Sequence, residues 1–315
     1  MPSRYRVAPL DLSKIETYPL ASRKSKVGAQ QLGKSVAPGG SFRSFWERLP
    51  DLLAARDLRE LVSRMKRAHD TDRAILWGLG AHVIKVGLSP LLIDLMERGY
   101  VHGLALNGAG IIHDFEMAVA GRTSEEVAEG LGAGKFGMAE ETGALLNEAI
   151  RKGIGLGLGL GESVCALLTD RDPPHRNVSL LWNAYRLEIP VTVHVAIGTD
   201  IIHMHPAASG EAIGSGSLID FRLFAGMVRG LDGGGVYLNF GSAVLLPEVF
   251  LKAVSVVRNL GYSLTDFSTA NFDFIRHYRP RMNVVERPVT GCGRGFDFVG
   301  HHEILMPLLA AALVD

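Results

Sequence analysis

The chain is short of cysteine, of net charge and of long apolar runs. Cys165 and Cys292 are its two cysteines and form no CxxC pair, so neither a disulfide framework nor a cysteine-ligated zinc site is expected. Lys+Arg number 33 against 33 Asp+Glu, which removes a general argument for nucleic-acid or membrane-surface binding. No apolar run reaches the roughly 18 residues needed to cross a bilayer. We therefore expect a soluble, cytoplasmic protein without nucleic-acid or membrane partners.

What the chain does contain is globular. Its 315 residues are 47% hydrophobic and 21% charged, which is enough to bury a full core. The 37 glycines follow no collagen-like period and therefore indicate many turns and close backbone approaches.

The first 45 residues differ from the rest. They hold eight Lys and Arg against two acids, Asp11 and Glu16. We expect a basic arm over residues 1–45 and a single domain over residues 46–315. A basic arm can touch nucleic acid, but wrapping a neighbouring subunit or staying solvated is more common.

From residue 49 onward, amphipathic helices alternate with short apolar strands. This alternation favours a parallel sheet with right-handed crossovers. Strands are predicted at 74–79, 103–107, 189–196, 236–240 and 263–271. Helices are predicted at 49–69, 89–99, 138–152, 177–187, 217–231 and 301–313, with Ser124 capping a further helix and an irregular tail over 279–300.

The segment 103–116 combines a strand, a glycine turn and a helix. Gly108 and Gly110 allow a ligand to approach the backbone, and the N-terminus of the following helix favours an anion. His113, Asp114 and Glu116 follow on that helix. We expect the chemistry here, against the alternative of a simple packing turn.

Three further strands end in small or polar residues. The four strand ends are Gly80 to His82, Asn107 to Gly110, Gly198 to Asp200, and Gly241 to Ala243. The carboxyl ends of parallel strands meet at one edge, so these turns together predict a nucleotide crevice rather than four unrelated tight turns.

Two other glycine-rich stretches carry no nucleotide signature. Residues 132–137 match GxGxxG, but a helical run precedes them instead of a strand, so a helix–helix corner is predicted. In residues 153–161 glycine alternates with aliphatic residues, which predicts a tight crossing of one backbone over another.

Histidines give the second chemical signal. In an extended segment His203 and His205 would share one face, and Asp200, His113 or Asp114 could complete a metal site. General acid–base catalysis is the more common use of such histidines. A metal-dependent hydrolase built on His113, His203 and His205 therefore stays as the alternative.

Over residues 70–315 the chain resembles the deoxyhypusine synthase family. The similarity is strongest in residues 86–115, with further pieces at 189–191, 241–242, 269–273 and 306–309. The resemblance implies a Rossmann-like, doubly wound NAD-binding fold with helices on both faces, a homotetramer, and NAD-dependent oxidation of a polyamine with transfer of its aminobutyl group. By position it implies NAD contacts from Gly80, His82, Asn107, Gly108, Ala109, Gly110, Asp114, Asp200, Gly241, Ser242 and Ala270.

The departures from the family change the expected reaction. No lysine follows Lys252, and Arg287 cannot replace the family's nucleophilic lysine because arginine does not lose its proton. We therefore expect an NAD-dependent enzyme that oxidises or transfers part of a small amine or polyamine without modifying a protein lysine. The acid–base candidates are His113, Asp114, Glu116, His203 and His205. A non-catalytic NAD-binding protein is the other alternative.

Overall fold

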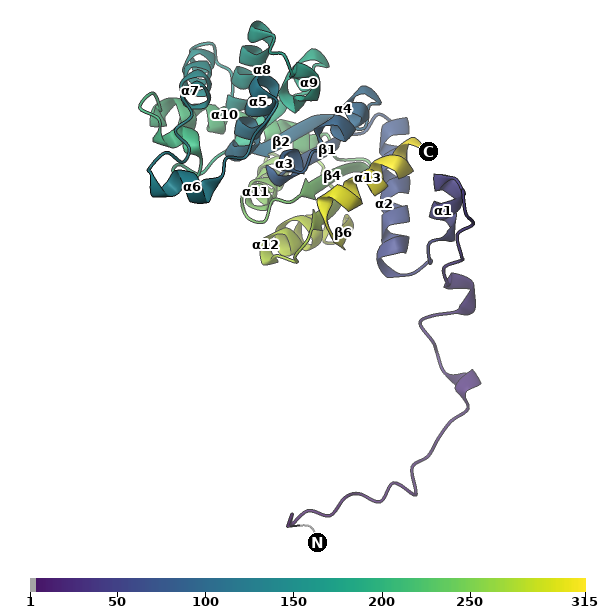
Figure 1. The fold of residues 1–315 in the computed structure, drawn as a ribbon. Coiled ribbons are helices and arrows are strands. Elements are labelled where there is room, and N and C mark those ends of the chain that lie inside the picture. The colour runs from purple at the N-terminus through teal and green to yellow at the C-terminus, as the bar shows by residue number, and fades with distance from the viewer. Residues whose placement is uncertain (1–3) are drawn as a thin grey trace.

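The computed structural model describes residues 4–315, in which a six-stranded, all-parallel sheet forms the centre (Figure 1). The strand order is β3-β2-β1-β4-β5-β6 and reverses between β1 and β4, as in doubly wound nucleotide-binding folds. The Rossmann-like α/β fold predicted from the sequence is thus confirmed. The strands are β1 Ile75–Leu79, β2 Gly103–Asn107, β3 Val191–His194, β4 Gly235–Phe240, β5 Phe267–Asp273 and β6 Gly293–Val299.

Helices cover both faces of this sheet. The helices are α1 Phe42–Arg48, α2 Leu53–Asp70, α3 His82–Lys85, α4 Ser89–Glu97, α5 Gly108–Ala120, α6 Val127–Gly132, α7 Glu140–Gly155, α8 Leu160–Arg171, α9 Leu180–Arg186, α10 Gly210–Arg229, α11 Leu245–Asn259, α12 Tyr278–Pro280 and α13 His302–Val314. Helices α10 and α11 pack on one face, while α2, α4, α5 and α13 pack on the other. Helices α7, α8 and α9 gather together (Figure 1), and α8 and α9 contact the edge strand β3.

Alternation along the strands explains the two covered faces. In β1, Ile75 and Trp77 belong to the core under α2 and α13, whereas Leu76 belongs to the core under α10 and α11. Successive side chains of a strand point to opposite faces, and a sheet buried on both faces needs apolar residues at every position. Gly78 is the exception, because a Cβ there would overlap with the hydroxyl group of Tyr237.

The prediction of an irregular tail over residues 279–300 was wrong, because β6 lies within it. Two glycines hide the strand pattern. A side chain on Gly293 would overlap with the carbonyl oxygen of Phe267, and one on Gly295 with that of Val285. The sheet therefore requires glycine where strand propensity alone disfavours it.

The alternating glycines at 153–161 form the turn between α7 and α8. A Cβ on Gly153 would overlap with Ser163, one on Gly159 with Asp220, and one on Gly161 with the backbone of β3. The predicted close backbone crossing is therefore present. The helix α8 that follows this turn was not predicted. The predicted cap Ser124 is also wrong: the side chain of Glu126 caps α6, and Ser124 has a φ of 71°.

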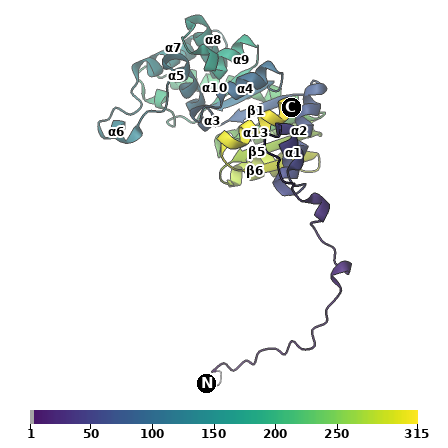
Figure 2. The ribbon, with the colours of Figure 1, turned by 45° about the vertical axis from the view of Figure 1, so that its right-hand side comes forward.

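The N-terminal segment runs away from the folded body (Figures 1 and 2). Residues 4–27 are exposed throughout, and hydrogen bonds tie residues 31–35 to residues 48–51. Within residues 4–315 no helix combines the length and the apolar character that crossing a bilayer requires.

Candidate functional site

The register of the sheet brings the predicted turns to one edge. Leu79 at the end of β1 pairs with Leu106 of β2 and with Phe240 of β4. Asn107 pairs with His194 at the end of β3. The turns that follow these strands therefore leave the sheet side by side.

At the point where the strand order reverses, the turns after β1 and β4 touch. The Gly80 amide donates a hydrogen bond of 2.7 Å to the Phe240 carbonyl, and a Cβ on Gly80 would overlap with the Gly241 carbonyl. Gly241 has a φ of 67°, and a side chain there would meet the ring of His302. Both glycines are therefore required by contacts within the protein.

His302 supplies an open acceptor at this point. Its Nε2 lies 3.2 Å from the Phe272 carbonyl, which makes Nε2 the protonated nitrogen of the neutral ring. Its Nδ1 is buried and has no hydrogen-bond partner among the described residues. Burial lowers the pKa of His302, so the ring stays neutral and Nδ1 keeps its lone pair. The ring of His82 lies 5.8 Å away, centroid to centroid.

The N-terminus of α5 is already occupied by side chains of the protein. The Asn107 side chain accepts a hydrogen bond from the Gly110 amide, and the Asp200 carboxylate lies against Gly108. Burial raises the pKa of Asp200, and the nearby Ala109 amide partly offsets this. Gly108 is needed because a Cβ there would overlap with Asp200. A phosphate at this helix end would meet the carboxylate of Asp200. The anion site expected at Gly108 to Gly110 is therefore not supported, and the edge beside β2 suits a cation or a hydroxyl group.

A relay of hydrogen bonds fixes His113 at this edge. Thr123 Oγ1 donates to Glu116 Oε2 at 2.5 Å and lies 2.7 Å from His113 Nδ1. Since the Thr123 hydroxyl proton goes to Glu116, His113 Nδ1 donates and Nε2 keeps the lone pair of a base. Burial lowers the pKa of His113, while Glu116 raises it and Lys85 lowers it.

His113 and Glu116 line a pocket of about 230 Å³ at the carboxyl ends of β2 and β3. Its walls come from α3, α5, the segment around α6 and the loop after β3. The lining residues are Lys85, Ala109, Ile112, His113, Glu116, Ser124, Glu125, Val127, Phe136, Thr199, Asp200 and Ile201. We call this the α3–α5 pocket.

Two predicted site residues are buried away from this edge. Asp114 is fully buried and accepts hydrogen bonds from the Ser179 hydroxyl and from the Leu180 and Leu181 amides. It holds the N-terminus of α9 and is not placed for acid–base work. Ala270 is fully buried within β5 and is not placed to contact a cofactor.

The two loop histidines do not share a face. Residues 201–204 form a 3-10 turn instead of an extended segment, so His203 and His205 diverge. His203 Nδ1 accepts from the Gly198 and Asp200 amides, and its Nε2 lies 4.0 Å from Asp200. His205 packs against Gly143 of α7. Consistent with this divergence, residues 4–315 contain no group of three His, Cys, Asp or Glu that could hold a metal ion.

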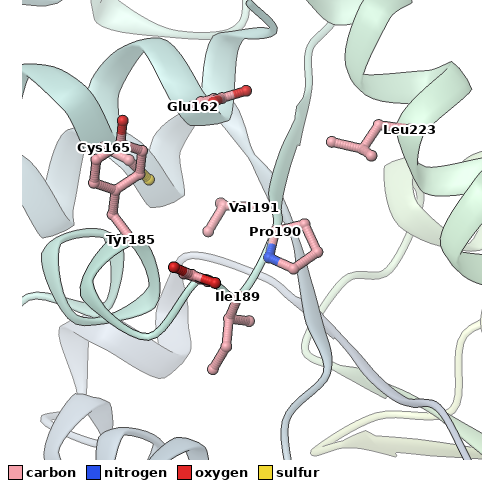
Figure 3. A pocket seen from close by; sticks show the side chains of 8 residues that line it. Glu162, Cys165, Tyr185, Ile189, Pro190, Val191 and Leu223 are labelled. Carbon is pink, nitrogen blue, oxygen red and sulfur yellow. The ribbon is translucent and has the colours of Figure 1, made fainter.

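A larger cavity of about 550 Å³ lies at the amino end of β3 (Figure 3). Its lining is largely apolar, with the exposed carboxylates of Glu162 and Glu188. Burial raises the pKa of the Cys165 thiol well above its ordinary value, which leaves it a poor nucleophile. The residues that line this cavity include no histidine or lysine, unlike those of the carboxyl edge.

Three residues of the carboxyl edge were not predicted as site residues: Lys85, Thr123 and His302. Lys85 lies three residues after His82 and thus on the same side of α3. That spacing was the one signal in the sequence for it. Nothing local marks Thr123 or His302, which reach the edge from a loop and from the last helix.

The sequence matches no protein-family model and no curated protein. Among solved structures, the fold is similar to the ternary complex of AgrE with ornithine and NAD+, with a TM-score of 0.54 and 14% identity over 82% of this chain and 33% of that chain. It is also similar to a candidate deoxyhypusine synthase from Entamoeba histolytica, with a TM-score of 0.52 and 9% identity over 90% of this chain and 96% of that chain. An arginine dihydrolase, ArgZ, from the ornithine–ammonia cycle in cyanobacteria gives a TM-score of 0.49 and 16% identity over 83% of this chain and 33% of that chain. This chain thus spans about a third of the length of ArgZ and AgrE. The likeness to AgrE and to the deoxyhypusine synthase lies in the parallel α/β fold.

Proposed function

We propose that the protein is an NAD-dependent enzyme that oxidises, or transfers part of, a small amine. The observation that carries this proposal is the position of α3 between two polar sites. Its first residue, His82, lies beside His302 where the strand order reverses, and its last residue, Lys85, lines the α3–α5 pocket with His113. One helical turn separates them. A dinucleotide bound at the turns after β1 and β4 would therefore adjoin a substrate in the pocket.

Two buried acceptors beside the turns after β1 and β4 suit the hydroxyl and amide groups of NAD. His302 Nδ1 and Asn239 Oδ1 have no partner within residues 4–315, and both lie close to the Gly241–Ser242 turn. Buried acceptors are normally paired, and ribose hydroxyls and the nicotinamide amide are donors. We assign cofactor contacts to His82, Ser242 and His302. Bound there, NAD+ would accept a hydride from the substrate carbon.

His113 is the proposed base. Its Nε2 would take a proton from the substrate ammonium group, while Thr123 and Glu116 hold Nδ1. Loss of that proton and of a hydride from the adjacent carbon converts R–CH2–NH3+ and NAD+ into R–CH=NH2+, NADH and H+. A second amine or water could then attack the imine carbon directly. The AgrE structure, which holds ornithine and NAD+ on a similar fold, supports an amine substrate.

Calorimetric titration of NAD+ tests the cofactor site. We expect saturable binding, weakened about tenfold by His302→Phe because one hydrogen bond is lost. The exposed neighbour His301 gives the matched control, since His301→Phe should bind NAD+ as the wild type does. Absorbance of NADH should then rise with amines such as ornithine and fail to rise with His113→Asn.

Two results would contradict the proposal. A folded protein that shows no saturable heat with NAD+ has no dinucleotide site. A protein that binds NAD+ but forms no NADH with any amine, in wild type and in His113→Asn alike, is a non-catalytic NAD-binding protein.

A further inference from the structure

The α3–α5 pocket carries charges of both signs. Lys85 is the one Lys or Arg among its lining residues, while Glu116, Glu125 and Asp200 are its carboxylates. They come from different elements, with Lys85 on α3, Glu116 on α5 and Asp200 after β3. A ligand in this pocket would therefore meet a cation and anions at separate points.

Lys85 has no carboxylate partner within the described residues 4–315. Lys152 and Lys252, by contrast, pair with Glu148 and Glu248 one turn earlier on their own helices. The positions four residues before and after Lys85 are Ala81 and Ser89, so α3 provides no such partner. The ammonium group of Lys85 is thus free to bind a ligand anion.

Hydrogen-bond donors of the protein hold the carboxylates in place. Glu116 accepts from the hydroxyl groups of Thr123 and Thr142, and the nearby Ala109 amide favours the ionised form of Asp200. A carboxylate has about four lone-pair positions, so each of these two carboxylates can accept further hydrogen bonds from a ligand in the pocket. These groups suit a ligand ammonium.

We infer that the pocket binds an amino acid, with the ligand carboxylate on Lys85 and its ammonium group against Glu116 and Asp200. A polyamine, which carries only ammonium groups, would meet Lys85 as a like charge. The volume of about 230 Å³ equals that of roughly eight waters in the liquid and suits a small amino acid. This inference rests on the proposed function for the reaction at this site, but its test measures binding alone.

Matched ligands that differ only in the carboxylate provide the test. L-norvaline is compared with butylamine, and L-lysine with cadaverine, by calorimetry on the full chain without NAD+. A charge-assisted bond contributes about 1.5–3 kcal/mol, so we expect the amino acid to bind about 10- to 100-fold more tightly than the amine. Lys85→Met and Lys85→Gln should remove this preference, and Lys85→Arg should keep most of it. Lys152→Met, at a paired surface lysine, is the control and should behave as the wild type does.

Equal binding of both members of each pair would overturn the inference, as would absence of binding or a preference that survives Lys85→Met. Loss of the preference in Lys85→Arg as well would also overturn it, because a guanidinium still holds a carboxylate. Formation of NADH separates the two hypotheses. Equal NADH formation from norvaline and butylamine would leave the proposed function standing without this inference. Selective binding of norvaline without formation of NADH would support this inference and contradict the proposed function.

Discussion

His113 lies between two groups that act on it in opposite directions. The carboxylate of Glu116 stabilises its protonated form and the ammonium group of Lys85 destabilises it, while burial lowers the pKa below its ordinary value of 6.5. The ring is therefore neutral at pH 7. A base of this kind loses function only when the pH falls below its lowered pKa.

The two neighbours should move the pKa of His113 in opposite directions. Glu116→Gln removes the charge that raises it, so the titration should shift to lower pH, whereas Lys85→Met should shift it to higher pH. Proton NMR of the His113 ring measures its pKa without requiring a substrate. The acid limb of the pH profile of NADH formation should shift in the same direction as this pKa. Lys152→Met, the control variant used for ligand binding, should leave the titration of His113 unchanged. Shifts of the same sign in both variants would show that the pKa reports burial and not these charges.

At the scale of single elements, the turn between α7 and α8 sets how closely α8 approaches β3. Gly161 lies in the first turn of α8, with its Cα against the Val191 carbonyl. Gly155, at the end of α7, faces open space. The two glycines are six residues apart in the sequence but differ completely in their surroundings.

Alanine at these two positions should therefore have different effects. Gly161→Ala forces backbone to move and should lower the free energy of unfolding by about 2–4 kcal/mol. Gly155→Ala should change it by about 0.5 kcal/mol or less, since alanine is favoured in a helix. Urea denaturation of both variants provides the measurement. Similar losses at both sites would mean that the contact with β3 is not what requires glycine.

At the scale of the whole molecule, two buried carboxylates join elements that are distant in the sequence. Asp114 holds the start of α9, and Asp220 accepts from the Gly161 and Val193 amides and so joins α8 to β3. Burial raises the pKa of Asp114 to about 6 and that of Asp220 to about 7, from 3.8. Folding therefore favours their protonated forms, and this stabilisation is present below pH 4 and lost as the pH rises to about 7.

Asp220→Asn should remove part of this pH dependence. Oδ2 of Asp220 accepts the Gly161 and Val193 amides, and the Leu160 amide also favours the ionised carboxylate. Oδ1 has no hydrogen-bond partner among residues 4–315, so the asparagine can keep its oxygen at the Oδ2 position and place its nitrogen at the Oδ1 position. We expect the variant to gain on the order of 2–4 kcal/mol at pH 8 and to show a flatter slope of unfolding free energy against pH. Denaturation at several pH values measures both. A variant less stable than the wild type at pH 8 would mean that the ionised carboxylate is favourable in the fold.

The N-terminal arm is the second feature of this scale. Residues 4–27 are exposed within the chain, so their removal costs little burial. We propose that the arm predicted over residues 1–45 is separate from the domain only up to about residue 27, because residues 31–35 bond to residues 48–51 and α1, which begins at Phe42, packs on the core. Deletion of residues 1–27 should leave the melting temperature within about 1 °C, given that about 1 kcal/mol shifts it by 2–4 °C in a large domain. A drop of several degrees would show that the arm stabilises the protein. A smaller oligomer of the deletion variant in sedimentation velocity would then show that the arm binds another copy within the predicted homotetramer.

The sequence by itself determined the parallel sheet, most of its strands and the turns at its carboxyl edge. These features are local: apolar runs mark buried strands, and glycine marks turns whatever lies around them. The exception, β6, was missed because Gly293 and Gly295 are required by close contacts with neighbouring backbone, although glycine has a low strand propensity.

Only the tertiary structure decided which side chains share the site. His113 and Asp114 are adjacent in the sequence, but one faces a pocket and the other supports α9, because successive residues of a helix point about 100° apart. Lys85 and His302 lie at the candidate site because of the way α3 and α13 pack against the sheet. Where a side chain points depends on the elements packed around its own, and that information is spread over the whole chain.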